Sequence, residues 1–254
     1  RRSDIAAIVL HWLQESGNEV NVFHYGAILN AYAKEGKWVK ALELLGEMEL
    51  NEIEINTITC SAAISACEKG CQWAKSLELL SVMERGRIEA NTITCSAAIS
   101  ACSKSGEWMK GLEILNTMLQ NRIEVDTFTY SAAISACDEA TEWMMALDLH
   151  GRMAQTGIER DMFTYNAASS SCANGSEWAK ALAFLSTMAR EGVNIGTITY
   201  SVAISGCQKG DRWGKAVELL SAMMQGRIEL NTITFNTAIN ACSKGGEWVK
   251  ALEL

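Results

Sequence analysis

The segment NTITCSAAISACEKG, residues 56–70, decides the fold, because copies of it recur at a fixed spacing along the chain. Four close copies begin at Asn91, Asp126, Gly196 and Asn231. Two more divergent copies begin at Asn21 and Asp161, so that every copy starts 35 residues after the one before it. A constant period without insertions or deletions is typical of repeat proteins, in which each unit stacks on its neighbours.

We begin each repeat unit at the residue that follows the Asn, Asp or Gly of a copy. This choice divides the chain into a partial unit at 1–21, full units at 22–56, 57–91, 92–126, 127–161, 162–196 and 197–231, and a truncated unit at 232–254. The sequence lacks an initiating Met and starts within a unit, so we expect it to be a segment of a longer chain.

Each full unit predicts two helices. In the unit 57–91, TITCSAAISACEK runs for 13 residues to a polar break, and WAKSLELLSVMERG then places apolar residues at i, i+3, i+4 and i+7. The second segment starts with Trp in every unit, at Trp38, Trp73, Trp108, Trp143, Trp178, Trp213 and Trp248. We therefore predict an all-α, right-handed α-solenoid with about fourteen antiparallel helices and no β-sheet, in which these seven tryptophans are at least half buried.

Other positions of the second helix are also constant and predict its packing. A Leu or Val follows four residues after the Trp, and a Met follows six residues later, at Met48, Met83, Met118, Met153, Met188 and Met223. Small residues recur where we expect helices to approach closely, at Ala41, Ser76, Gly111, Ala146, Ala181 and Ala216. Such stripes are typical of a helical core and not of a cofactor site.

The composition indicates a folded chain. It has 254 residues, of which 48% are hydrophobic and 20% are charged, which excludes the class of disordered proteins. It contains no proline, which disfavours a loop-rich all-β protein, and no apolar run near the ~20 residues that a membrane span needs. We see no signal peptide at the start of the sequence.

The cysteines follow the repeat and predict no special chemistry. Six of the nine occupy one phase, at Cys67, Cys102, Cys137, Cys172, Cys207 and Cys242. We expect buried structural thiols, without disulfide or zinc, in a reducing compartment. The three histidines fall at three different phases, and no paired carboxylates, nucleophile elbow or phosphate loop interrupts the period. We accordingly predict no metal, no cofactor and no enzymatic activity.

The repeats resemble those of the pentatricopeptide repeat family. The resemblance rests on the 35-residue period, the T-[IF]-T-[YCF]-[SN] opening, the Lys that ends the first helix, and the A-L-E-L-L-x-x-M and G-[IV]-E segments, and it covers essentially the whole chain. Two features depart from the family pattern, namely the Trp that opens the second helix and the absence of Pro near the end of each unit. The tetratricopeptide repeat fits less well, because its W-x2-L-G-x2-Y opening is absent.

The residues on one face of the first helix are nearly the same in every unit, and this observation does not depend on the resemblance. Residues two, five, nine and thirteen of a unit are spaced to share a face, and residue nine is always Ser or Asn. The second residue is apolar although the helix already has a core side, which would allow it to stack on a base; these residues are Phe23, Ile58, Ile93, Phe128, Phe163, Ile198 and Ile233. The thirteenth is Lys34, Lys69, Lys104, Lys209 and Lys244 in five units. Each lysine either contacts a phosphate or merely complements the helix dipole.

The resemblance implies a function and a set of base-selecting residues. Proteins of this family bind single-stranded RNA with one base per repeat, usually in mitochondria or plastids, and choose the base mainly with residue five and the last residue of a unit. The corresponding pairs are Gly26 with Asn56, Ser61 with Asn91, Ser96 with Asp126, Ser131 with Asp161, Asn166 with Gly196, Ser201 with Asn231, and Asn236 with a residue outside the sequence. Ser with Asn resembles an adenine pair, Ser with Asp a guanine pair, and Asn as residue five a pyrimidine pair. The implied RNA core is 5′-A-G-G-Y-A-3′ over the five units that begin at Thr57.

The charge leaves a second interpretation open. A net charge of −8 and a pI of about 5.1 oppose the basic surface typical of nucleic-acid binders. The first thirteen residues of the seven units carry +2 in total, however, so the remaining segments carry −10. An RNA-binding groove is compatible with this distribution. The alternative is a structural adaptor that binds protein subunits of a larger organellar complex through its acidic exterior.

Overall fold

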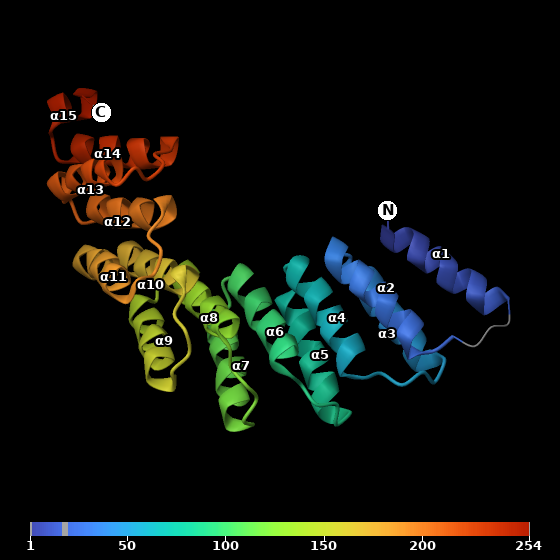
Figure 1. The fold of residues 1–254 in the computed structure, drawn as a ribbon. Helices are drawn as coiled ribbons and strands as arrows, with labels where there is room; N and C mark the ends of the chain where they lie inside the picture. Colours follow the sequence, from blue (N-terminus) through green and yellow to red (C-terminus); the bar gives the residue numbers. More distant parts are fainter. Residues whose placement is uncertain (1, 17–19, 254) are drawn as a thin grey trace. The chain divides into compact units, whose positions relative to one another are not determined.

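The structure, a computed structural model, describes residues 2–16 and 20–253 of the chain, which form helices joined by short connectors, without a strand (Figure 1). It divides into two compact parts, an N-terminal part that ends at Ala132 and a C-terminal part that begins at Ala133. The division falls within one helix, and each part is a stack of helical hairpins. The predicted all-α solenoid is confirmed.

In its described residues, the N-terminal part contains seven helices and the start of an eighth. They are α1 (Arg2–Glu15), α2 (Val22–Glu35), α3 (Trp38–Leu50), α4 (Thr57–Lys69), α5 (Trp73–Arg85), α6 (Thr92–Lys104) and α7 (Trp108–Gln120), followed by α8 (Thr127–Glu139). The first helices of successive units pack on each other, as α2 does on α4 and α4 on α6. Second helices contact the first helices before and after them in sequence, as α3 contacts α2 and α4, and α5 contacts α4 and α6.

The C-terminal part repeats the same arrangement. Its helices are α9 (Trp143–Thr156), α10 (Met162–Asn174), α11 (Trp178–Glu191), α12 (Thr197–Lys209), α13 (Trp213–Gln225), α14 (Thr232–Lys244) and α15 (Trp248–Glu253). From α2 onward, every first helix begins at the first residue of a unit. From α3 onward, every second helix begins at the tryptophan of its unit. The helix boundaries predicted from the period are therefore confirmed.

The predicted stripes form the core. All six methionines and all six cysteines of the repeated phases are at most 1% exposed, and the small residues of the second helix are likewise buried. Of the seven tryptophans that open second helices, six are mostly buried, as predicted, whereas the Trp248 side chain lies outside the described residues. All nine cysteines are free thiols, and only Cys71 is exposed. Burial raises the pKa of the buried thiols, for example that of Cys102 to about 11.

The tryptophans pack against the next unit. Trp178 at the start of α11 lies over the end of α12, where an added Cβ at Gly210 would lie 2.4 Å from its ring. Trp38 faces Gly70 in the same way, at 2.3 Å. The guanidinium of Arg212 also lies 4.9 Å from the centre of the Trp178 ring. This close approach explains why glycine commonly follows the first helix. The backbone angles there do not require glycine, because φ is −87° at Gly210 and suits any residue.

We expect Gly210→Ala to destabilise the protein by about 1–2 kcal/mol, because the new methyl group overlaps the Trp178 ring. The cost is moderate because Ser105 occupies the equivalent place in another unit, so neighbouring side chains can adjust. Gly214→Ala is the matched control: it lies within α13 with no atom within 4 Å of the added Cβ, and should stabilise by about 0.5–1 kcal/mol. Urea unfolding of both variants measures the difference. Equal stabilities would contradict this packing.

One core position breaks the repeat. His150 in α9 takes the place of the leucines Leu45, Leu115 and Leu220 and is 6% exposed. Its ring packs edge-on against Tyr165 and Phe184, with centroids 4.6 and 5.2 Å away. Its Nε2 has no hydrogen-bond partner among the described residues. Burial, assisted by the nearby positive charge of Arg160, lowers the pKa of His150 to about 4, so the ring is held neutral.

Candidate nucleic-acid interface

The last residue of each unit caps the first helix of the next. Oδ1 of Asn56 accepts hydrogen bonds from the backbone amides of Ile58 and Thr59 at 3.0 and 3.1 Å. Asn91, Asp126, Asp161 and Asn231 each accept in the same way from the amide three residues later. These residues therefore stabilise the helix starts, because Asn and Asp are preferred N-caps. Gly196 occupies the same place without a side-chain cap.

Capping engages only one polar atom of each side chain. Among the described residues, the hydrogen bonds of these caps all go to Oδ1. The second polar atom is Nδ2 in Asn91 and Oδ2 in Asp126, and both residues are exposed. An asparagine thus presents a hydrogen-bond donor and an aspartate an acceptor from the same helix start. This difference can distinguish two bases.

The second residues of the units are exposed, as stacking on a base requires. We call these residues the apolar stripe; their exposed fractions are 79% for Phe23, 64% for Ile58, 64% for Ile93 and 55% for Phe128 in the N-terminal part, and 64% for Phe163, 60% for Ile198 and 66% for Ile233 in the C-terminal part. Each lies two residues after an N-cap, on the first turn of its helix. A large apolar side chain that is more than half exposed is available to contact a ligand.

The fifth residues are less accessible than the apolar stripe. Gly26, Ser96 and Asn166 are buried, while Ser61, Ser131 and Ser201 are partly buried and Asn236 is exposed. The Ser61 hydroxyl donates to the carbonyl of Thr57 at 2.6 Å and lies 2.7 Å from the Thr94 hydroxyl of the next unit. Oδ1 of Asn166 is buried without a hydrogen-bond partner among the described residues. Residue five therefore lies deeper between units than the shared helix face alone suggested.

Three of the five lysines already have partners in the preceding unit. Lys69 donates to the carbonyl of Lys34 at 3.3 Å, Lys104 pairs with Glu68 at 2.9 Å, and Lys209 donates to Oδ1 of Asn174 at 2.5 Å. All five lysines are exposed. Their positions line the end of the first helix in each part and remain compatible with phosphate contact, but Lys104 brings a neutralising carboxylate with it.

Two carboxylates in this region were not singled out from the sequence. Glu68 accepts hydrogen bonds from Ser100 and Lys104, both at 2.9 Å, and so joins residues nine and thirteen of the next unit. Asp138 accepts from Asn174 at 2.8 Å, and burial raises its pKa. The twelfth residue is acidic in only these two units, so no periodic signal marks it. The two carboxylates reduce the positive charge at the lysine positions.

Models of the PPR repeat family match residues 20–69 and 90–139, and models of the PPR repeat match residues 198–228 and 233–254. The chain belongs to the pentatricopeptide repeat (PPR) family. A comparison with curated proteins finds no match.

Solved PPR structures share the fold of this PPR array. The pentatricopeptide repeat protein PPR10 from maize superposes with a TM-score of 0.66 at 15% identity, and the match covers 99% of this chain and 40% of that one. The PPR domain of Arabidopsis thaliana protein-only RNase P 1, in complex with tRNA, gives a TM-score of 0.61 at 15% identity, with coverage of 74% and 95%. PPR10 in complex with an 18-nt psaJ RNA element gives 0.50 at 21% identity. The PPR array thus spans about two fifths of the length of PPR10.

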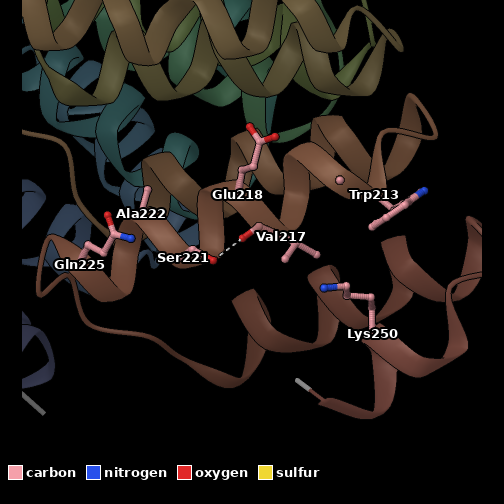
Figure 2. A pocket seen from close by; sticks show the side chains of 8 residues that line it. Trp213, Val217, Glu218, Ser221, Ala222, Gln225 and Lys250 are labelled. Carbon is pink, nitrogen blue, oxygen red and sulfur yellow. Dashed lines mark hydrogen bonds between the residues drawn. The ribbon is translucent and has the colours of Figure 1, made fainter.

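A cavity beside α13 of the PPR array offers no comparable set of groups (Figure 2). Its wall includes Trp213, Val217 and Glu218 of α13 and Lys250 of α15. Glu218 pairs with Lys215 on its own helix at 2.6 Å, and the Ser221 hydroxyl donates to the carbonyl of Val217 at 3.0 Å (Figure 2). Glu218 and Ser221 are thus already bound within α13.

Neither a metal cluster nor a membrane helix is found in the part of the chain that the structure describes. No three of its His, Cys, Asp and Glu side chains come close enough to hold a metal ion together. None of its helices has the length and apolar content needed to cross a bilayer.

Proposed function

We propose that this chain binds single-stranded RNA in an organelle, a mitochondrion or plastid, with one base per repeat and without chemistry of its own. The observation that carries the proposal is the apolar stripe, whose members are 55–79% exposed beside N-caps that keep one polar atom free. The solved relatives that contain RNA support the same function by their fold. The exposed stripe supplies stacking, and the caps supply a means of selecting the base.

Each base would lie between the stripe residues of two successive units, with its edge toward the N-cap between them. For the unit 57–91 these are Ile58, Ile93 and Asn91. The amide of Asn91 would donate to a ring nitrogen of adenine, whereas a carboxylate in its place would accept from the amino and imino groups of guanine. At the fifth position of a unit, Ser61 or Asn166 would contribute a further contact to the base. The expected core is 5′-A-G-G-Y-A-3′ over the units that begin at Thr57, Thr92, Thr127, Met162 and Thr197.

Replacing Asp126 and Asp161 by Asn should change the preferred base from guanine to adenine at two positions. Both caps would remain, because Asn56 and Asn91 show that asparagine makes the same hydrogen bond. We expect a change of about 5-fold to 10-fold in relative affinity per position, as for the exchange of one hydrogen-bonding pattern. Fluorescence anisotropy with AGGYA and AAAYA oligomers at low salt measures it. Unchanged preference with an intact helical spectrum would contradict the assigned base selection.

The alternative function is a protein-binding scaffold, which the paired lysines and acidic second helices favour. Salt dependence separates the two. At most three lysines, Lys69, Lys104 and Lys209, lie along the central units, so RNA binding should weaken with a slope of no more than about −2 in log affinity against log salt. If neither an AGGYA oligomer nor a scrambled control forms a complex at low salt, the scaffold is the better interpretation.

A further inference from the structure

A cavity between α5 and α7 in the N-terminal part is not explained by RNA binding. It has a volume of about 770 Å³. Apolar side chains make up about half of its wall, including Leu77, Leu80 and Ile114. The polar part of the wall includes Glu84, Thr117 and Asn121, with Glu89, Lys110 and Glu113 beside them. Cys95 also lines it and is 4% exposed. A cavity that combines apolar side chains with polar groups able to orient a ligand is the usual form of a small-molecule site.

The cavity lies where other units bury a tyrosine ring. Cys95 is the fourth residue of its unit, and the fourth residue is Tyr25 two units earlier and Tyr165 two units later. Both tyrosines are completely buried. Cysteine has no ring, so the unit that contains Cys95 leaves this space unfilled. A packed array that loses a ring at one position retains a cavity there unless its neighbours collapse.

The polar groups that hold the Tyr25 hydroxyl have counterparts in the cavity wall. This hydroxyl accepts hydrogen bonds from Nε2 of Gln14 at 3.1 Å and Nδ2 of Asn51 at 3.3 Å, and donates to Oε1 of Glu47 at 3.2 Å. The equivalent residues two units later are Glu84, Asn121 and Thr117, and all three line the cavity.

The apolar neighbours of Tyr165 correspond in the same way. The Tyr165 ring packs against His150 and Phe184, and its hydroxyl donates to Oε2 of Glu191 at 2.5 Å. The equivalent residues two units earlier are Leu80, Ile114 and Asn121, which also line the cavity. The two comparisons therefore define the same space, with an apolar interior and a polar rim, around an absent phenol ring.

From this correspondence we infer that the cavity binds a small phenolic molecule. Its ring would lie between Leu80 and Ile114, and its hydroxyl would contact Asn121 and donate to the carboxylate of Glu84. This site is formed mainly by second helices and their connectors, whereas the apolar stripe lies on first helices. Occupation of the cavity and RNA binding are thus separate properties of the array.

The test uses p-cresol, which is the tyrosine side chain as a free molecule. We expect p-cresol to bind the wild-type protein with a dissociation constant on the order of 1 mM, as suits eight heavy atoms, and to raise its melting temperature. Toluene, which has the same ring and methyl group but no hydroxyl, should bind at least about 5-fold more weakly. NMR contacts between the p-cresol ring and the Ile114 methyl groups should locate it.

Cys95→Tyr is the decisive variant, because it supplies the ring in the same chain. It should have a higher melting temperature than the wild type and should no longer bind p-cresol. Should the variant fail to fold, Ile114→Phe, which restores the ring of Phe184 at its equivalent position, fills the same space. The matched control is Met109→Ser on the exposed face of α7, which should leave p-cresol binding unchanged. Absence of p-cresol binding to the wild type, equal binding of toluene, or binding that persists in the filled variants would each overturn the inference.

Discussion

The free energy of unfolding should fall by about 3 kcal/mol between pH 6.5 and pH 4 because of His150 alone. Its pKa is lowered from 6.5 in the unfolded chain to about 4 in the folded protein, so within this range the unfolded chain binds a proton that the folded protein excludes. A histidine kept neutral by burial contributes its full stability above pH 6.5, and this contribution is lost as the pH falls toward 4. A difference of 2.5 pH units corresponds to about 3 kcal/mol.

His150→Leu should remove this loss. Leucine occupies the equivalent buried position at Leu45, Leu115 and Leu220, so the side chain suits the site. We expect the variant to be more stable than the wild type by about 1–2 kcal/mol at pH 7.5, because Nε2 is no longer buried without a partner. The gap should widen by up to about 3 kcal/mol at pH 4.

Urea unfolding of both proteins at pH 7.5, 5.5 and 4.5 measures the widening. His11→Gln, which alters a histidine whose side chain is 74% exposed, is the matched control. A gap that stays constant with pH would show that His150 is not buried in its neutral form.

Loss of the apolar stripe should weaken RNA binding by about 30-fold to 150-fold. The change is the triple variant Ile58→Ser, Ile93→Ser and Phe128→Ser in the N-terminal part. Stacking is worth on the order of 1 kcal/mol per base on an aromatic ring and less on isoleucine, so three positions contribute about 2–3 kcal/mol. These side chains are 55–64% exposed, so the melting temperature should change little.

The control for this variant is Val39→Ser with Met109→Ser, which removes apolar side chains that are 47% and 61% exposed on second helices. The control should bind RNA like the wild type. Electrophoretic or anisotropy titration of the three proteins with one AGGYA oligomer compares them directly. Equal losses in both variants would indicate nonspecific contact with exposed apolar surface, and no loss in the stripe variant would contradict stacking.

Much of the fold could be predicted from the sequence because the same local signals recur at every unit. Asn56 precedes a helix that begins at Thr57, and the next helix begins at Trp73, both as the period indicated. The stripes of Met83 and Cys67 are core for the same reason, since residues at one phase share one environment when identical hairpins stack. Where one residue differs from the others at its phase, as His150 does, the phase still predicts its environment, because His150 is buried like the leucines of other units.

The candidate site could be predicted only in part. The exposure of Ile93 follows from helix geometry, because the core side of its helix is already occupied by Cys95 and Ile99. The bond of Lys104 did not follow, because its partner is an acid 36 residues earlier that occurs in only two units. Side-chain pairing between units depends on distances that a repeat pattern does not contain.

The sequence by itself therefore determined the period, the helix boundaries, the core stripes and the face that carries the apolar stripe, since each depends on local propensity and on the identity of neighbouring units. The tertiary structure alone decided which lysines are paired between units, for Glu68 holds Lys104. It also decided that Cys95 leaves a cavity between α5 and α7. These outcomes depend on how side chains from adjacent units fill the space between them, and only their packed arrangement shows where that space is empty.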